Sequence, residues 1–127
     1  MGKGYRKGDF VMSDVCESSI RETILSFGKH ASTLVELTIK DSEKYIEEME
    51  EAIAQGNPMA AGLAAHALKS IMRQIQATDL SEIAFDIEKN GKDGNLARCI
   101  DLADSLRESW KKTRIILASF LSSPPSS

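Results

Sequence analysis

Apolar residues recur at intervals of three, four or seven positions along most of this chain. In the segment 30–55 the pattern is carried by Val35, Ile39, Ile46, Met49 and Ile53. Such intervals place the apolar side chains on one face of an α-helix and the polar side chains on the other. The same spacing predicts helices at 14–27, 58–76 and 96–120, and a further helix that ends near residue 91. No segment alternates with a period of two, so we expect no strands.

Short breaks separate the predicted helices. Gly56 suits a left-handed C-cap, Asn57 suits an N-cap, and Pro58 suits the first position of the next helix. Thr78 or Asp79 is expected to cap the helix after that. Four long amphipathic helices joined by short turns predict an antiparallel four-helix bundle, preceded by a short additional N-terminal helix.

The chain is expected to form one all-α domain. Its 127 residues fit a single modest core, which we place at 14–121, between a flexible leader at 1–13 and a disordered tail at 122–127. The formal net charge of −3 argues against general nucleic-acid binding, which requires a basic face. No apolar run reaches the roughly 18 residues of a membrane span, and no signal-peptide pattern is present. Cys16 and Cys99 form no C-x-x-C pair, so we expect reduced thiols in a cytoplasmic protein. We also expect the protein to be a monomer.

His66 is the residue that points to a function. At about 100° per residue, Ala64, Leu68, Ile71 and Ile75 cluster within roughly 60° of the helix, and His66 lies about 160° from their centre. We therefore expect His66 to face solvent. Its neighbours three, four and seven positions away are small, cationic, hydroxyl-bearing or apolar: Met59, Gly62, Leu63, Lys69, Ser70 and Arg73. These surroundings suit a histidine that meets a large anionic partner.

The stretch from His66 to Glu88 resembles the histidine-containing phosphotransfer (HPt) domain of multistep phosphorelays. The residues that match the family pattern are Ala65, His66, Leu68, Lys69, Ile75, Ala77, Leu80 and Glu88. A Phe27-Gly28 opening of an upstream helix also fits, and the resemblance covers roughly residues 17–121. Ser70 and Gln76 depart from the pattern, because each replaces a usual glycine. The first of these glycines leaves space for a receiver domain, so the serine bears on function.

The resemblance implies an all-α bundle in which His66 accepts a phosphoryl group from a receiver-domain aspartate and passes it to another receiver. Imidazole offers an uncharged nucleophilic nitrogen for this step. By the same resemblance, Glu88 hydrogen-bonds the other ring nitrogen and orients the ring. Lys69, Ser70 and Arg73 are expected to neutralise or contact the phosphoryl oxygens. The partner receiver would supply Mg²⁺, and we expect no cofactor or metal site in the chain itself.

The expected partners are response-regulator receiver domains and a hybrid sensor histidine kinase. Met59, Gly62 and Leu63 are expected to form the surface on which receivers dock. The chain has no G-x-x-x-x-G-K-[ST] and no G-x-G-x-x-G loop. We therefore expect a phosphocarrier without ATP-dependent kinase activity of its own.

Two other functions stay open at this point. A degenerate HPt-like adaptor, which binds receivers or kinases without carrying phosphate, fits the changes at Ser70 and Gln76. An unrelated helical interaction module would make the His66 site incidental. The presence of both His66 and Lys69 favours the phosphocarrier. The sequence is compatible with a free-standing protein and with a domain of a hybrid kinase.

Overall fold

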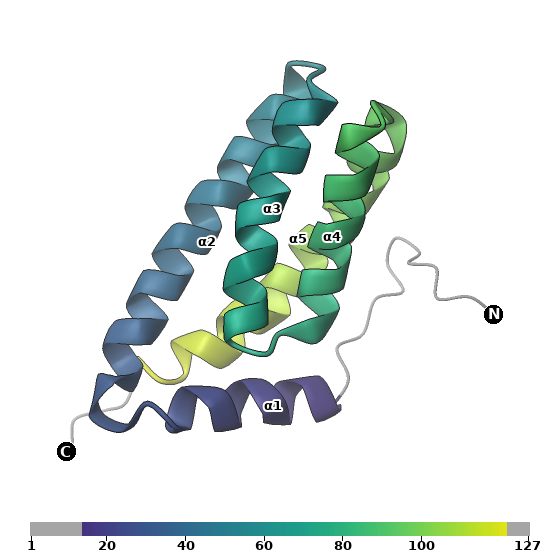
Figure 1. The fold of residues 1–127 in the computed structure, drawn as a ribbon. Helices are drawn as coiled ribbons and strands as arrows, with labels where there is room; N and C mark the ends of the chain where they lie inside the picture. The colour runs from purple at the N-terminus through teal and green to yellow at the C-terminus, as the bar shows by residue number, and fades with distance from the viewer. Residues whose placement is uncertain (1–13, 122–127) are drawn as a thin grey trace.

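Residues 14–121 form an all-α fold in this computed structural model, which describes that range of the chain. The predicted leader at 1–13 and tail at 122–127 lie outside the described residues. The elements are α1 (Asp14–Leu25), the 3₁₀ helix η1 (Gly28–His30), α2 (Ala31–Ala54), α3 (Pro58–Gln74), α4 (Thr78–Lys92) and α5 (Leu96–Ala118). Helices α2 to α5 form an antiparallel bundle, and α1 crosses one end of it (Figure 1). The predicted fold class and the additional N-terminal helix are confirmed.

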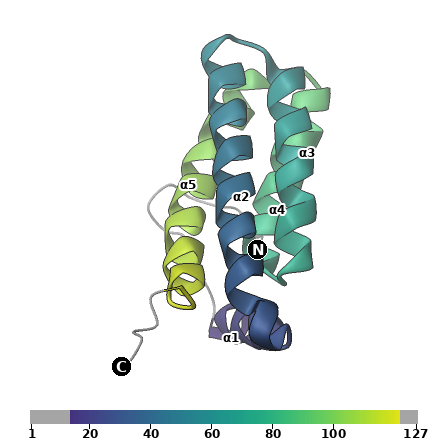
Figure 2. The ribbon, with the colours of Figure 1, turned by 90° about the vertical axis from the view of Figure 1, so that its left-hand side faces the viewer.

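The core lies between the four long helices. Figure 2 shows α2 flanked by α3 and α5, with α4 behind them. The apolar stripe predicted on α2 is buried at Val35 and Met49 and partly buried at Ile53. Other large side chains are fully buried, including Leu68 on α3 and Leu106 on α5. Burial of these apolar faces holds the helices together and leaves their polar faces outside.

The three turns between the long helices share one length and one backbone geometry. Each connection has three residues, and the middle residue has a positive φ: 70° at Gly56, 64° at Gln76 and 74° at Gly94. In each turn the N–H of the third residue donates to the carbonyl five residues earlier, at 2.8 or 2.9 Å, as in a Schellman C-cap. The C-cap predicted at Gly56 is confirmed. At Gln76, where the HPt pattern has a glycine, the left-handed conformation costs roughly 1–2 kcal/mol.

The turn between α3 and α4 also lacks the side-chain cap of the other two turns. Asn57 and Asn95 cap α3 and α5, each with a side chain that accepts a hydrogen bond from a backbone N–H of the first turn. Ala77 holds the equivalent position before α4 and offers no such acceptor. The prediction that Thr78 or Asp79 caps α4 was therefore wrong, because the helix begins at Thr78 itself.

Helices α3 and α4 meet at two buried glycines, Gly62 and Gly91. A Cβ atom at Gly91 would lie 2.5 Å from the Pro58 carbonyl oxygen and 2.8 Å from Gly62 Cα. A Cβ atom at Gly62 would lie 3.1 Å from the Glu88 carbonyl oxygen. Side chains here would push the helices apart, so the two glycines set the distance between α3 and α4. The prediction that Gly62 lines a docking surface was wrong, because Gly62 is buried against α4.

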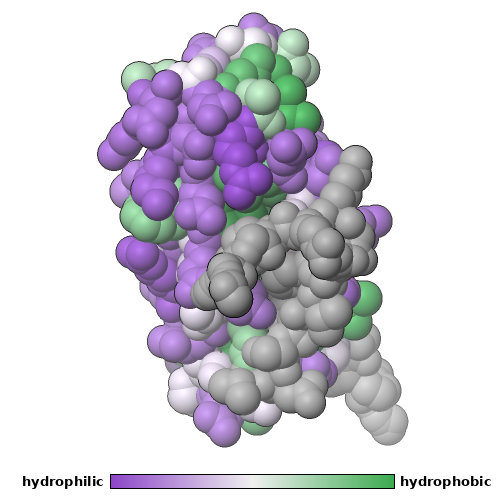
Figure 3. Space-filling model, turned by 90° about the vertical axis from the view of Figure 1, so that its right-hand side faces the viewer, coloured by the Kyte–Doolittle hydropathy of each residue, from purple (hydrophilic) through white to green (hydrophobic). Residues whose placement is uncertain are grey.

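Hydrophilic side chains cover most of the described surface on the side of the bundle seen in Figure 3. On α2 and α5, charged side chains pair across the surface: Arg107 with Glu50 at 2.5 Å, and Arg114 with Glu43 at 2.6 Å. These acidic side chains of α2 therefore lie on a solvated face, and cations of α5 partly balance their charge. Within residues 14–121, no helix is both long and apolar enough to cross a membrane.

Candidate functional site

His66 lies near the middle of α3 on its outward face. The His66 side chain is 58% exposed, whereas Ala65 and Leu68 on the same helix are fully buried. The helical period explains this difference, because it turns the apolar residues toward the core and His66 away from it. The prediction that His66 faces solvent is confirmed.

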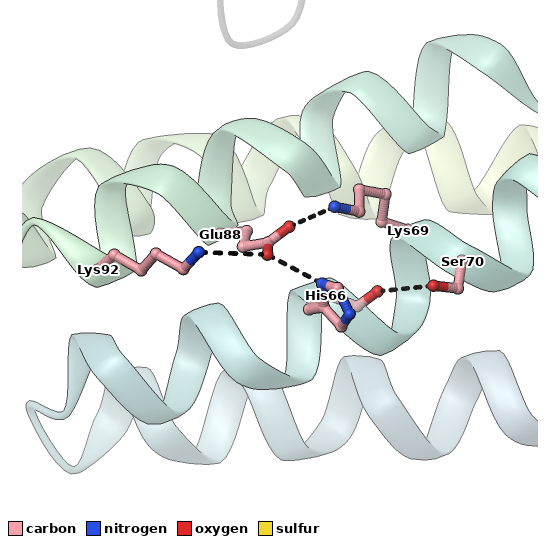
Figure 4. A network of polar contacts seen from close by, with 5 residues as sticks. All are labelled: His66, Lys69, Ser70, Glu88 and Lys92. Carbon is pink, nitrogen blue, oxygen red and sulfur yellow. Dashed lines mark hydrogen bonds and ion pairs between the residues drawn. The ribbon is translucent and has the colours of Figure 1, made fainter.

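Glu88 of α4 contacts the ring of His66 and two lysines. Glu88 Oε2 lies 2.9 Å from His66 Nδ1, and Lys69 Nζ donates to Glu88 Oε1 at 2.7 Å (Figure 4). Lys92 Nζ, one turn further along α4, lies 3.9 Å from Glu88 Oε2. The side chains of Lys69 and Glu88 are only 10% and 9% exposed. These four residues form a polar network between α3 and α4, with a buried ion pair at its centre and an exposed imidazole at its edge.

The charge of Glu88 decides which nitrogen of His66 is available. Burial raises the pKa of Glu88, but hydrogen bonds and charges from Lys69 and His66 outweigh that effect and lower the pKa below its ordinary value of 4.5. At neutral pH the carboxylate is therefore ionised and can only accept hydrogen bonds. His66 Nδ1 must then be the donor. The neutral ring is left with an unprotonated Nε2, which is its nucleophilic nitrogen.

The residues near His66 fall on two sides of it. At about 100° per residue, Lys69 lies about 60° from His66 on the side of α4, and Leu63 lies about 60° away on the open side. Lys69 therefore bonds to Glu88 and does not project into solvent beside the ring. Met59 and Leu63 are 53% and 66% exposed, which is compatible with a docking surface. Docking itself stays a prediction.

Ser70 and Arg73 are exposed on α3. The Ser70 hydroxyl donates to the His66 carbonyl oxygen at 3.4 Å, so it turns back toward its own helix. The serine that replaces the usual glycine therefore adds one small, exposed side chain one turn from the ring. Arg73 lies two turns beyond His66 on nearly the same side of the helix. Contact between either residue and a phosphoryl group stays a prediction.

Lys92 and Phe85 contact the Lys69–Glu88 pair, although neither residue was predicted from the sequence. Lys92 follows Glu88 by four positions on α4, a spacing that puts two side chains on one helix face and indicates such a pair. Phe85 is 39% exposed, and the centre of its ring lies 5.0 Å from Lys69 Nζ. The contact between Phe85 and Lys69 joins two different helices, α4 and α3. The spacing of residues along one helix therefore could not predict it.

Thiol and metal chemistry have less support than histidine chemistry in the part of the chain that the structure describes. Burial raises the pKa of the Cys99 thiol, which disfavours the reactive thiolate. Within residues 14–121, no three histidine, cysteine, aspartate or glutamate side chains gather in a way that could hold a metal ion. The exposed imidazole of His66 therefore stays the candidate nucleophile of this range.

Comparisons with known proteins bear on the family and on the fold. The family model of the Hpt domain matches residues 33–114, a range that contains His66, Lys69, Glu88 and Lys92. The crystal structure of histidine-containing phosphotransfer protein B (HptB) from Pseudomonas aeruginosa PAO1 is similar, with a TM-score of 0.73 over 85% of this chain and 91% of that chain. Because the two chains are 20% identical, this second similarity shows the fold alone. No match was found among curated proteins.

Proposed function

Because this chain belongs to the Hpt domain family, whose members are phosphocarriers of two-component signalling, we propose that His66 carries a phosphoryl group between receiver domains. The group would come from the phosphoaspartate of one receiver and pass to the aspartate of another. The observation that supports this proposal best is the exposed imidazole of His66, whose Nδ1 lies 2.9 Å from the ionised Glu88 carboxylate. An imidazole held in this way offers Nε2 to a partner.

In the proposed step, His66 Nε2 forms a bond to phosphorus, and the bond between phosphorus and the aspartyl oxygen breaks. The aspartate leaves as a carboxylate, and the phosphorylated ring keeps its Nδ1 proton and gains a positive charge. The Glu88 carboxylate stabilises this charge, because it accepts the Nδ1 hydrogen bond. Phosphoryl transfer depends mainly on alignment and on cations near the phosphoryl oxygens. The receiver would supply Mg²⁺ for that purpose.

Exposed cations on α3 and α4 are the candidates to balance the phosphoryl oxygens. The Lys92 side chain is 67% exposed, and its Nζ lies 3.9 Å from the Glu88 oxygen that contacts His66. Arg73 is exposed on the other helix, and Ser70 adds a hydroxyl one turn from the ring. Met59 and Leu63 would give a receiver an apolar contact on the open side of α3.

The partners that we propose are response-regulator receiver domains and a hybrid sensor histidine kinase, which the chain meets in the cytoplasm as a monomer. The kinase would use ATP, and this chain would act only as the carrier. A phosphate-free adaptor has less support, because an adaptor needs neither an exposed imidazole nor a buried carboxylate that orients it. Ser70, which together with Gln76 favoured the adaptor hypothesis, has its hydroxyl directed toward the His66 carbonyl oxygen.

The test is incubation with a panel of phosphorylated receiver domains, followed by measurement of acid-labile, alkali-stable phosphate on the chain. We expect label on the wild type and none on His66→Gln. The exposed His30 is the matched control, and His30→Gln should keep the label. Because His66 is exposed, the free energy of unfolding of His66→Gln should lie within about 1 kcal/mol of the wild-type value. A folded wild type that no receiver labels would instead favour the adaptor.

A further inference from the structure

We infer that Lys69 is a positioning residue, which acts on His66 through Glu88 and does not contact the phosphoryl group. This inference rests on the proposed function of His66, and it assigns Lys69 a different role from the one expected for a cation one turn away from a phosphorylated histidine. Three observations carry it: the burial of Lys69, the division of the Glu88 oxygens between two partners, and the presence of other cations with greater exposure.

The first observation is that the Lys69 ammonium lies inside the α3–α4 interface. The Lys69 side chain is 10% exposed, and its Nζ lies between the Glu88 carboxylate at 2.7 Å and the ring of Phe85 at 5.0 Å from the ring centre. To reach a phosphoryl group on His66, Lys69 would have to leave both contacts. Breaking a buried ion pair by removing one partner leaves an uncompensated charge and is strongly unfavourable.

The second observation is that each oxygen of the Glu88 carboxylate has its own partner. Lys69 binds Oε1, and His66 Nδ1 binds Oε2 (Figure 4). A carboxylate that is held at one oxygen cannot rotate freely, so Lys69 directs the other oxygen at the imidazole. Without Lys69, the carboxylate would turn toward the exposed Lys92 or take up a proton. A protonated carboxyl can donate as well as accept, so it would no longer select the Nδ1-protonated ring.

The third observation is that Lys92 can meet an incoming phosphoryl group without breaking a buried contact. Its side chain is 67% exposed, and its Nζ lies 3.9 Å from Glu88 Oε2, which is a longer and more exposed contact than that of Lys69. The two lysines thus share one carboxylate, but only the Lys92 side chain can move without leaving a buried contact. The buried lysine fits a role in orienting His66, and the exposed lysine fits a role in balancing charge.

The experiment is a double-mutant cycle between Lys69→Met and Glu88→Gln, with two readouts. The first readout is the tautomer of the His66 ring from its imidazole ¹⁵N shifts at alkaline pH, which requires no phosphotransfer. The second is the rate at which phosphoramidate, a small phosphoryl donor, labels His66 in the absence of any receiver. Lys69→Met alone should reduce the Nδ1-protonated tautomer and slow labelling on the order of tenfold, the size of coupling found within one hydrogen-bond network.

In the Glu88→Gln background, Lys69→Met should cause no further loss of that tautomer and should slow labelling by less than about twofold. The reason is that a carboxamide carries no charge for Lys69 to balance or direct. Equal slowing by Lys69→Met in both backgrounds would overturn the inference, because Lys69 would then act on the phosphoryl group itself. An unchanged tautomer in folded Lys69→Met would overturn it as well.

Lys89→Met is the matched control for the loss of one lysine. Lys89 Nζ also lies 5.0 Å from the centre of the Phe85 ring, but its ion pair is with Asp86 and not with Glu88. Its effect on labelling should therefore be the same in both Glu88 backgrounds. If Lys69→Met does not fold, Lys69→Gln removes the charge but keeps a hydrogen-bond donor for Glu88 Oε1. Its loss of the tautomer and of labelling rate should be smaller than that expected for Lys69→Met, and it should again disappear in the Glu88→Gln background. The two ideas can fail separately. If Lys69→Met loses the Nδ1-protonated tautomer as expected but the wild type is never labelled, the positioning role is sustained and the phosphocarrier is rejected.

Discussion

The helix pairs α3–α4 and α2–α5 are both bridged by carboxylate–cation pairs, but the two pairs of helices place these bridges in different environments. Between α3 and α4, Glu88 and Lys69 are 9% and 10% exposed and 2.7 Å apart. Between α2 and α5, Glu50 and Arg107 are 38% and 44% exposed and 2.5 Å apart. The bond lengths are similar, so burial makes the difference. A buried pair keeps one geometry and can orient a third group, whereas water screens and loosens an exposed pair.

The interiors of the two interfaces differ as well. Helices α3 and α4 approach through Gly62 and Gly91, and the buried polar atoms of Lys69 and Glu88 bind one another. On helices α2 and α5 the described structure holds three buried hydroxyls without a hydrogen-bond partner, those of Ser42, Ser109 and Thr113. The interface next to His66 is therefore specific in shape and in charge. The three unpaired hydroxyls on α2 and α5 instead cost stability, because buried polar groups in folded proteins are usually hydrogen-bonded.

The largest effect that we expect is at the glycine contact. Gly91→Ala places a Cβ atom where the Pro58 carbonyl oxygen would be 2.5 Å away, so α3 and α4 must separate. We expect the free energy of unfolding to fall by about 3 kcal/mol, measured by urea denaturation. Gly62→Ala should lose less, because its closest atom would lie 3.1 Å away. A loss at Gly91 below about 1 kcal/mol would mean that the helix spacing is not set by this contact.

The next effect concerns the buried pair. Lys69→Met leaves Glu88 without the ammonium at 2.7 Å, and the free energy of unfolding should fall by about 3 kcal/mol or somewhat less. Replacing both partners, in Lys69→Met with Glu88→Leu, should restore at least half of that loss, since apolar substitutes need no counterion. The same double change should also remove the orientation of His66. Urea unfolding of the wild type and of these two variants would measure the contribution of the pair to stability, and the imidazole ¹⁵N shifts of His66 would measure its contribution to the site.

A smaller effect of opposite sign is expected at a buried position of α5. Thr113→Val replaces a buried hydroxyl that has no partner by a methyl group of similar volume. Because burial of an unpaired hydroxyl is unfavourable, the variant should gain about 1 kcal/mol in the free energy of unfolding. Thr33→Val, at an exposed position of α2, is the control and should change little. Destabilisation by Thr113→Val would reveal a hydrogen bond of that hydroxyl in solution.

The smallest effect is expected at the exposed bridge. Arg107→Met removes the bonds to Glu50 and Asp104, but all of these groups are in contact with water. The free energy of unfolding should change by less than about 0.5 kcal/mol, and the change should shrink further at about 1 M salt, where charges are screened. A loss as large as that of Lys69→Met would contradict the distinction between the two interfaces.

Features that depend on neighbours along the chain could be predicted from the sequence. The period of α3 placed His66 outward, and Gly56 with Asn57 indicated the turn before that helix. These predictions need only local rules of helix geometry and capping. The local rules failed at the next turn, where Gln76 adopts the left-handed conformation with a φ of 64° and Ala77 replaces a capping residue. Tertiary packing of α3 against α4 overrides the local preference there.

Features that depend on the next helix could not be predicted. The helical period gives the direction of Lys69 and Gly62 relative to His66, but not which of those directions α4 covers. Both residues are buried for that reason. Glu88 was expected beside the ring from family resemblance alone, and its Oε2 does lie 2.9 Å from His66 Nδ1. That resemblance gave no indication that Lys69 would bind the other oxygen.

The uncapped turn at Gln76 and Ala77 has a consequence for local opening of the α3–α4 hairpin. This turn contains a residue with a strained backbone, Gln76, and has no side-chain cap. The backbone amide hydrogens next to it should therefore exchange with solvent early. The Gly62–Gly91 contact closes the other end of the hairpin, and the Lys69–Glu88 pair closes its middle. Amide protection should therefore rise from the turn toward Gly62. His66 lies on the protected part of this gradient, so the hairpin can fray while the imidazole keeps its orientation.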